Sequence, residues 1–427
     1  MTVLVAGGGI GGLTLALSLH QIGVPVQVFE SDTEPKALGV GINLLPHASR
    51  ELIDLGLLDR LGEIGIRTEG LAYYSKHGKL VWREPRGLSA GYKWPQFSVH
   101  RGRLRRLLWE VAAERLGAGS IFAGHRLQTW EASGAGVRAT FADPRSGRSI
   151  GSFEGVLLVG ADGIHSTVRT AFRPGEGAPR WNRSIMWRGV TVGPSFLGGA
   201  TMITAGHEAQ KFVAYPISPI DPATGRQTIN WIAERRFRGD YEWRRETYDR
   251  SGRLEDFLPW FEDWTFDWLD VPRIIRDAEY IYEYPMVDRD PLDRWTDRRV
   301  TLLGDAAHPM YPMGSNGASQ AILDARVLTR SILEHGETPE ALAAYEAERR
   351  PATTKVVELN RRNGPDHVLQ LVEERAPGGF ERIDDVMPEA ERQAIAANYQ
   401  RIAGFDRDAL NGSPPIVPSR PAYGASP

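Results

Sequence analysis

The residues best suited to bind a cofactor stand at the start of the chain, in the run Gly7-Gly8-Gly9-Ile10-Gly11-Gly12. This run fits the pattern G-x-G-x-x-G, in which Gly7 permits a tight turn, Gly9 lets the backbone approach a pyrophosphate, and Gly12 lets helix and strand pack closely. Glu30 follows at the end of the next predicted strand, where its carboxylate can accept a hydrogen bond from a ribose 2'-hydroxyl. The pattern predicts a site for an ADP group, and by itself it does not distinguish FAD from NAD.

The elements that position these residues form a βαβ pattern in the first 30 residues. We expect a strand over residues 2–6, a helix to about residue 22 and a second strand over residues 25–29. Apolar segments at 156–159 and 300–303 each end in small residues and an aspartate, Asp162 and Asp305. Their spacing predicts one sheet assembled from distant parts of the chain.

The region from about 180 to 285 has a different sequence pattern, with short runs in which apolar and polar residues alternate. Such alternation predicts half-buried antiparallel strands, for example over residues 185–191 and 211–217. Residues of equal parity share a face, so Lys211, Val213, Tyr215 and Ile217 should point the same way. After Asp305 we expect helices, with Thr338 and Pro339 beginning one and Pro351 beginning another. Residues 412–427 contain five prolines and are interpreted as a mobile tail.

Composition narrows the class of protein. The chain has 427 residues, enough for two or three domains. Its 51 basic and 54 acidic residues give a formal net charge of -3, which argues against nucleic acid as a partner. It contains no cysteine, so disulfides, thiolate nucleophiles and Cys-ligated metals are excluded, and no metal site is predicted. No apolar run is long enough to span a membrane, and we expect a soluble, cytoplasmic protein, either monomer or homodimer.

Three motifs in order carry a resemblance to a known family. Residues 160–169 (GADGIHSTVR), 304–309 (GDAAHP) and 312–317 (PMGSNG), together with the glycine run, resemble the signatures of single-component FAD-dependent aromatic hydroxylases, the family of para-hydroxybenzoate hydroxylase. The resemblance covers about the first 370 residues. Residues 38–43, 98–101, 186–190 and 284–290 look most like the phenazine-carboxylate monooxygenase branch.

The resemblance implies an α/β fold with a Rossmann-like, GR2-type FAD-binding domain. An α+β substrate domain built on an antiparallel sheet would be inserted into it, and the C-terminal part would be helical. The expected FAD-binding domain comprises residues 1–72, 96–178 and 286–375. The substrate domain comprises residues 73–95 and 179–285, and residues 376–427 form a C-terminal helical segment with a Pro-rich tail.

The cofactor residues follow from the motifs. Asp305, after a buried strand, can accept a hydrogen bond from a polyol such as ribitol, and the Gly314–Gly317 turn opens a helix whose amides stabilise negative charge on a reduced flavin. The resemblance assigns Asp162 and Gly163 to a motif that touches both FAD and the pyridine nucleotide, with Arg169 supporting it and Arg101 reaching the flavin. The full predicted set is Gly7, Gly9, Ile10, Gly11, Gly12, Glu30, Val40, Gly41, Arg101, Asp162, Gly163, Arg169, Gly304, Asp305, Pro312, Gly314, Asn316, Gly317 and Ala318. Ser319 and Gln320 depart from the family pattern, which usually has asparagine at the position of Ser319.

Substrate residues are expected on the alternating strands. Tyr215 matches a tyrosine that faces the substrate in 3-hydroxybenzoate 6-hydroxylases, whereas Lys211 stands where those enzymes have histidine. Lys211 could pair with a substrate carboxylate or reach solvent. The predicted apolar wall, which could equally be ordinary core, consists of Trp187, Met310, Tyr311, Pro312 and Met313. His308 is interpreted as a packing residue at the start of a helix rather than as a catalyst.

The activity that the resemblance implies is hydroxylation of an aromatic or N-heteroaromatic ring. NADH or NADPH, binding transiently because no second G-x-G-x-x-G is present, would reduce FAD; O2 would add at flavin C4a, and the hydroperoxide would transfer oxygen to the ring. Alternatives are Baeyer-Villiger or epoxidation chemistry on a polyketide or quinone, and a nucleotide-binding sensor or scaffold with an occluded or missing cavity. Residues 87–91 match the hydrolase pattern G-x-S-x-G around Ser89 but follow no apolar strand, so we interpret the match as coincidence.

Overall fold

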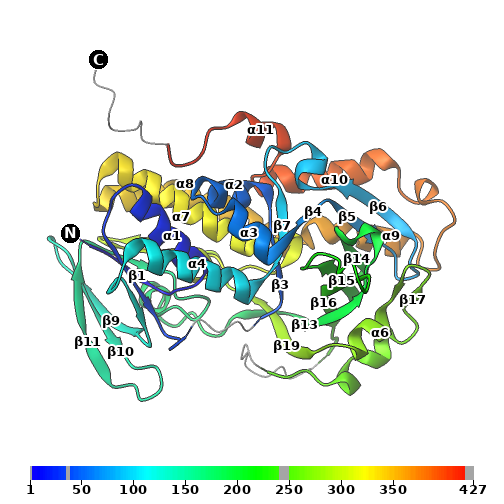
Figure 1. Cartoon of the computed structure of the whole chain (residues 1–427), viewed down its shortest axis with the longest axis horizontal. Coiled ribbons are helices and arrows are strands. Elements are labelled where there is room, and N and C mark those ends of the chain that lie inside the picture. Colours follow the sequence, from blue (N-terminus) through cyan, green and yellow to red (C-terminus); the bar gives the residue numbers. More distant parts are fainter. Residues whose placement is uncertain (1, 35–38, 240–249, 419–427) are drawn as a thin grey trace.

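A parallel sheet forms the centre of the cofactor-binding half of the protein. The computed structural model describes residues 2–34, 39–239 and 250–418, and Figure 1 shows the arrangement of its elements. The strand order is β20-β21-β12-β1-β2-β8, and all neighbours are parallel except β20 and β21. The strands are β1 (Val3–Ala6), β2 (Val26–Glu30), β8 (Ile121–Ala123), β12 (Leu157–Gly160), β20 (Thr296–Asp297) and β21 (Val300–Leu302). The predicted single sheet from distant segments is therefore confirmed.

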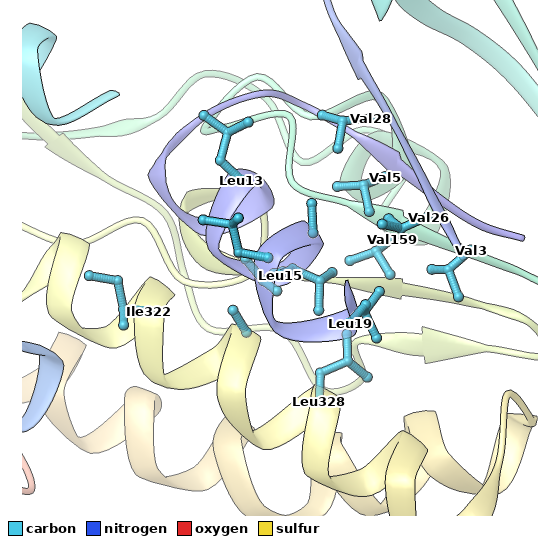
Figure 2. Close-up of a cluster of buried hydrophobic side chains, with 14 of the residues drawn as sticks. Val3, Val5, Leu13, Leu15, Leu19, Val26, Val28, Val159, Ile322 and Leu328 are labelled. Carbon is cyan, nitrogen blue, oxygen red and sulfur yellow. The ribbon is translucent and has the colours of Figure 1, made fainter. Parts of the chain in front are cut away.

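Both faces of this sheet are covered, which explains the continuous apolar runs of its strands. Figure 2 shows Leu15 and Leu19 of α1 (Ile10–Gln21) between the strand valines and Leu328 of α7 (Gly317–His335). On the other face lies a three-stranded antiparallel sheet, at the lower left of Figure 1, where the rings of Phe29 and Phe141 stack with centroids 4.0 Å apart. Its strands are β9 (Arg126–Ala132), β10 (Val137–Ala142) and β11 (Ser149–Gly155).

A second, seven-stranded sheet forms the substrate half, with the order β19-β13-β16-β15-β14-β5-β6. All its pairs are antiparallel except β5 with β14. Its strands are β5 (Gly70–Tyr74), β6 (Leu80–Pro85), β13 (Arg180–Pro194), β14 (Thr201–His207), β15 (Gln210–Pro216), β16 (Arg226–Arg236) and β19 (Tyr280–Asp288). Two of them cross expected domain boundaries: β5 continues past residue 72 and β19 past residue 285, because each pairs with the substrate sheet along its length.

Smaller elements join the two halves. A three-stranded sheet of β3 (Gly41–Leu44), β7 (Gln96–His100) and β4 (Gly65–Thr68) lies beside α2 (Pro46–Asp54), α3 (Leu58–Ile64) and α4 (Arg101–Leu116). The substrate half also carries β17 (Thr265–Phe266), β18 (Leu269–Asp270) and α6 (Val271–Arg276), and α5 (Thr167–Phe172) follows β12. Ser89 is exposed in a 3-10 turn over Gly87–Ala90, which is not the strand-turn-helix setting of a hydrolase nucleophile.

The C-terminal part is helical, as expected, with two differences from the predictions. Helix α8 (Pro339–Asn360) begins after Thr338, but Pro351 lies inside it rather than beginning a new helix. The remaining helices are α9 (His367–Arg375), α10 (Glu389–Ile402) and α11 (Arg407–Gly412). In the described part of the predicted tail, Val417 is 1% exposed and packs in the main core, whereas residues 412–415 and Pro418 are exposed. Residues 419–427 lie outside the described residues.

Within the described part of the chain, no helix combines the length and apolar character that crossing a membrane requires.

Candidate active site

A cavity of about 410 Å³ lies where the two halves meet. Its wall combines the first turn of α1, residues 39–43, the turns over residues 303–318, and side chains of the seven-stranded sheet. The predicted residues that line it are Gly9, Ile10, Gly11, Gly12, Val40, Gly41, Arg101, Gly163, Lys211, Tyr215, Gly304, Asp305, Met310, Pro312, Met313, Gly314, Asn316, Gly317 and Ala318. Those that do not line it are Gly7, Glu30, Asp162, Arg169, Trp187 and Tyr311. The alternative of a nucleotide-binding sensor or scaffold predicted an occluded or missing cavity, and the presence of this cavity argues against it.

The glycine run has the geometry that a phosphate site needs. Gly7 has a φ of 117°, and a Cβ there would lie 2.2 Å from the carbonyl oxygen of Ala161. A Cβ on Gly12 would lie 2.0 Å from the carbonyl oxygen of Gly7, so only glycine lets α1 approach β1. A Cβ on Gly9 would meet nothing within 4 Å and would project into open space at the N-terminus of α1. That space is where the helix dipole favours an anion.

Glu30 is held in place beside the glycine run. Its carboxylate accepts hydrogen bonds from the amide nitrogens of Gly8 at 2.7 Å and Asp32 at 2.8 Å, and it pairs with Arg105 at 3.1 Å. A carboxylate has about four lone-pair sites. The hydroxyl of Ser31 also donates to this carboxylate, at 3.0 Å, so four partners already match its lone-pair sites. The expected bond to a ribose hydroxyl remains a prediction, and it would have to replace or share one of these contacts.

The turn that carries Asp305 is fixed from behind by a buried aspartate that sequence analysis missed. Asp324 on α7 accepts hydrogen bonds from the amide of Gly304 at 3.0 Å and from Arg349 at 2.8 Å, and it bonds His308 at 2.5 Å. Burial raises the pKa of Asp324, but His308 and Arg349 outweigh it and lower the pKa to about 2. The Asp305 side chain is exposed at the cavity, whereas His308 packs in the interior and does not line it. The packing interpretation of His308 agrees with this placement.

Arg169 links the two later motifs. Its guanidinium is 1% exposed and donates hydrogen bonds to the carbonyl oxygens of Ala306 at 3.2 Å and Ala307 at 2.8 Å, and it pairs with Glu176. Asp162 accepts a hydrogen bond from the amide of Thr167 at 2.8 Å, while its other carboxylate oxygen is buried without a partner. Arg169 therefore ties the motif at 160–169 to the turn that follows Asp305.

The turn before α7 is held by the C-terminal helices. Asn316 is fully buried, and its side chain donates to the hydroxyl of Tyr399 on α10 at 3.0 Å. Ser319 and Gln320 point away from the cavity: Ser319 accepts from the amide of Leu45 at 3.3 Å, and Gln320 donates to the carbonyl oxygen of Ala403 at 2.9 Å. Their departure from the family pattern thus lies behind the turn rather than on the cavity surface.

The loop over residues 39–41 is tied to the substrate sheet. Asn230 accepts a hydrogen bond from the amide of Gly41 at 2.6 Å, and Arg188 donates to the carbonyl oxygen of Gly41 at 3.0 Å. Tyr280 donates to the carbonyl oxygen of Gly39 at 3.2 Å. A Cβ on Gly41 would lie 2.6 Å from Asn230, so glycine is required for this close approach.

Strand β15 divides its side chains as the parity rule predicts. Lys211, Val213 and Tyr215 line the cavity, whereas Phe212 and Ala214 belong to the core behind the sheet. Tyr215 is 3% exposed, and burial raises its pKa to about 12 although the neighbouring Arg188 opposes this shift. Its hydroxyl therefore keeps its proton at neutral pH and can donate a hydrogen bond.

Lys211 lines the cavity without reaching solvent, and two carboxylates already pair with it. It is 4% exposed, and its Nζ lies 2.8 Å from Asp366 and 3.2 Å from Glu234. Burial lowers the pKa of Lys211, but the two carboxylates outweigh it and raise the pKa above its usual value. Burial raises the pKa of Glu234. Lys211 is a charged anchor between the sheet and the turn before α9.

The apolar wall of the cavity contains only some of the predicted residues, since Trp187 and Tyr311 do not line the cavity. Trp187 lies on the opposite face of β13 from the cavity, where its ring stacks on Phe257 with centroids 4.8 Å apart. Because side chains alternate along a strand, its neighbours Met186 and Arg188 line the cavity instead. Tyr311 is buried beside the wall in a cluster with Met186, Met286 and Met313. The apolar wall thus exists but is built around methionines.

Comparison with known proteins decides the family. Residues 1–209 and 282–360 match the FAD binding domain family. The chain is 47% identical over 361 residues to a phenazine 1,6-dicarboxylic acid hydroxylase of Lysobacter antibioticus, which covers 84% of this chain and 89% of that protein. The chain belongs to the single-component FAD-dependent aromatic hydroxylases. The expected family, fold and FAD cofactor are confirmed.

Further comparisons agree with this flavoprotein family. The chain is 31% identical over 367 residues to a 3-amino-4-hydroxybenzoate 2-monooxygenase of Streptomyces cremeus, covering 84% of this chain and 86% of that one. The crystal structure of Klebsiella pneumoniae HpxO with FAD and uric acid superposes with a TM-score of 0.73 at 22% identity, covering 96% of each chain. That structural likeness supports the fold.

The site residues of this flavoprotein fit FAD. The space beside Gly9 accommodates a pyrophosphate, Asp305 presents an exposed carboxylate for a polyol, and the Gly314–Gly317 turn directs the N-terminus of α7 at the cavity. These features run along one continuous cavity from the nucleotide end to the substrate sheet. When bound, FAD supplies the redox chemistry that activates O2 for insertion into an organic ring.

Several residues at the site were missed from sequence. Parity alone could not find Met186, Arg188 and Glu234, because no residue of β13 or β16 had been correctly assigned to the cavity. The register sets Glu234 opposite Lys211 and Met186 opposite Glu234, and only the folded sheet reveals it. Asp366 and Tyr399 come from elements that no motif marked. Only the folded arrangement of the C-terminal helices reveals them.

Proposed function

We propose that this flavoprotein hydroxylates a flat, carboxylated N-heteroaromatic ring of phenazine type, with NADH or NADPH as the reductant. The balanced reaction is ring C–H plus O2, NAD(P)H and a proton, giving ring C–OH, water and NAD(P)+. The relative at 47% identity is named for a phenazine dicarboxylic acid, which supports this substrate class. NADH or NADPH as the reductant fits the family to which the chain belongs.

The observation that carries the proposal is the apolar wall beside the flavin turn. Met186, Met286, Tyr311 and Met313 form one buried cluster next to the N-terminus of α7. A second cluster, which contains Val40, Val213 and Tyr215, lines the side of the loop at 39–41. Apolar walls of this kind suit a polycyclic ring and would keep water from the reacting carbon.

The chain's own residues then have distinct tasks. Asp305, Arg101 and the glycine run would hold the cofactor, and the amides at the start of α7 would stabilise negative charge on it. Tyr215, protonated at neutral pH, would donate a hydrogen bond to the substrate. The Lys211–Glu234–Asp366 anchor would fix the far side of the chamber.

A substrate screen tests this proposal. Holoenzyme would be mixed with NADH or NADPH and with phenazine-1-carboxylic acid, phenazine-1,6-dicarboxylic acid, 3-hydroxybenzoate or 6-hydroxynicotinate, and both oxygen uptake and loss of the ring compound would be followed. We expect the phenazine acids to accelerate NAD(P)H oxidation and to be consumed. Consumption of the single-ring acids alone would contradict the proposed substrate class.

A further inference from the structure

Arg188 on β13 is a cavity-lining cation with unused hydrogen-bonding capacity. One terminal nitrogen donates to the carbonyl oxygen of Gly41 at 3.0 Å, while its Nε is buried and has no partner among the described residues. Burial lowers the pKa of Arg188, and the neighbouring hydroxyl of Tyr215 only partly opposes this effect. A buried guanidinium donor without a partner costs free energy unless a ligand satisfies it.

Arg86 and Arg392 also have a buried Nε without a partner among the described residues, but each of them pairs with a carboxylate. Each arginine that is less than a tenth exposed forms an ion pair with an aspartate or glutamate. These are Arg50, Arg169, Arg326, Arg349 and Arg392. Arg188 forms no ion pair with any carboxylate in the described residues, and no carboxylate contributes to its pKa. Such a charge is expected to find its counter-ion elsewhere.

The surroundings of Arg188 point to a ligand on the ring-binding side of the cavity. Met186 on the same strand and Val213 on β15 line the cavity with it and are apolar. Lys211, the other cation on the described strands of this sheet that lines the cavity, is already neutralised by two carboxylates. Of the other cavity-lining arginines, Arg86 pairs with Glu84 and Arg101 is assigned to the cofactor. A negatively charged group on a flat ring would therefore meet Arg188 and the hydroxyl of Tyr215 beside it.

We infer that Arg188 and Tyr215 form a carboxylate-binding subsite that orients the substrate ring in the cavity. The planar guanidinium can present its Nε and a terminal nitrogen to the two oxygens of one carboxylate, while Tyr215 donates to the same group. The inference rests on the proposed function, because it assigns the ring carboxylate of that substrate class to these residues. It makes Arg188 the residue that selects acids over neutral rings of the same shape.

Ligand binding to the FAD-loaded protein tests this subsite without turnover. Dissociation constants would be measured from the change in flavin absorbance for phenazine-1-carboxylic acid and for its uncharged analogue phenazine-1-carboxamide. We expect Arg188→Gln to weaken binding of the acid by about 10- to 100-fold and of the amide by less than about threefold. Arg188→Lys, which keeps the charge but loses the planar donor pair, should give an intermediate value for the acid. Arg148→Gln, an exposed arginine in the turn between β10 and β11, is the control and should change neither.

Three results would overturn the subsite. One is an equal loss of affinity for acid and amide, which would give Arg188 a purely structural role. Another is unchanged affinity for both compounds. The third is loss of FAD affinity in both Arg188 variants, which would assign the guanidinium to the cofactor. A matched pair of 3-hydroxybenzoate and 3-hydroxybenzamide separates this inference from the proposed function, because an acid-over-amide preference that depends on Arg188 would support the subsite even if phenazines did not bind.

Discussion

The hydroxyl of Tyr399 on α10 donates a hydrogen bond to the carbonyl oxygen of Met313, at 3.0 Å, across 86 residues of sequence. The same hydroxyl accepts a hydrogen bond from Asn316, and a Cβ on Gly314 would lie 2.1 Å from it. Both Tyr399 and Phe405 line the cavity. The C-terminal part is therefore part of the cavity wall and not an appended segment.

Tyr399→Phe should loosen the turn at 313–316. Removing the hydroxyl leaves the buried side chain of Asn316 without its acceptor and the carbonyl of Met313 without its donor. We expect the free energy of unfolding to fall by about 1–3 kcal/mol, and FAD affinity to fall with it. Denaturant titration and FAD titration measure the two effects. Tyr282→Phe is the control, because the Tyr282 hydroxyl makes no hydrogen bond with the described residues; equal effects of the two variants would contradict the account.

Asp305→Ala should weaken FAD binding by removing the acceptor expected for ribitol. Hydrogen bonds to a charged group contribute about 1.5–3 kcal/mol, so the dissociation constant should rise by about 10- to 100-fold. Because the Asp305 side chain is exposed, the fold should be unaffected. FAD titration of the apoprotein measures the change, with the exposed Asp263→Ala as control. Unchanged FAD affinity in Asp305→Ala would refute the assignment.

Lys211→Met should be strongly destabilising at neutral pH. It leaves Glu234 and Asp366 close together without their cation, a change that costs about 3–5 kcal/mol for a buried pair. Burial already raises the pKa of Glu234, and loss of Lys211 raises it further. The penalty should therefore shrink as the pH falls through that raised pKa and Glu234 takes up a proton. Unfolding measured between pH 7 and pH 5 tests this. A penalty independent of pH, or one matched by the exposed Lys79→Met, would contradict it.

The carboxylate of Asp324 should stabilise the fold only at pH values at which it is ionised. Its pKa is lowered from 3.8 to about 2 in the folded protein, so its stabilisation is present above about pH 4 and is lost as the pH falls toward 2. The shift corresponds to about 2 kcal/mol at neutral pH. We expect the stability difference between the unsubstituted protein and Asp324→Asn to narrow as the pH falls from 5 to 3. A difference that stays constant would show that the carboxylate charge is not the cause.

The cofactor-binding end of the site could be predicted from the sequence because its residues lie close together along the chain. The glycine turn, the strand before it and Glu30 lie within 30 residues, and their roles follow from backbone geometry that only glycine permits. Parity along β15 was also predictable, since alternation depends only on the strand itself. Trp187 was assigned to the wall for its apolar ring alone, and a one-residue difference along the strand places it in the core behind the sheet, the alternative left open from sequence.

The rest depended on contacts between distant segments. Asp366 reaches Lys211 across 155 residues, and nothing near either residue marks the pair. Pro351 was interpreted as the beginning of a helix because proline favours the first turn, yet α8 continues through it. The hydroxyl of Thr353 donates a hydrogen bond to the carbonyl oxygen of Arg349 at 3.0 Å, and these two residues stand on either side of Pro351 in the same helix. Packing of α8 against α7 outweighs the local preference.

Incorporation of labelled oxygen tests most directly that this protein is a FAD-dependent monooxygenase. FAD-loaded protein would be supplied with NADH or NADPH, phenazine-1-carboxylic acid and 18O2, and the product analysed by mass spectrometry. The account predicts a hydroxylated ring that carries one 18O atom, with one NAD(P)H oxidised for each product formed. Hydrogen peroxide as the sole oxygen product with every aromatic acid tried, or a hydroxyl oxygen derived from water, would contradict it.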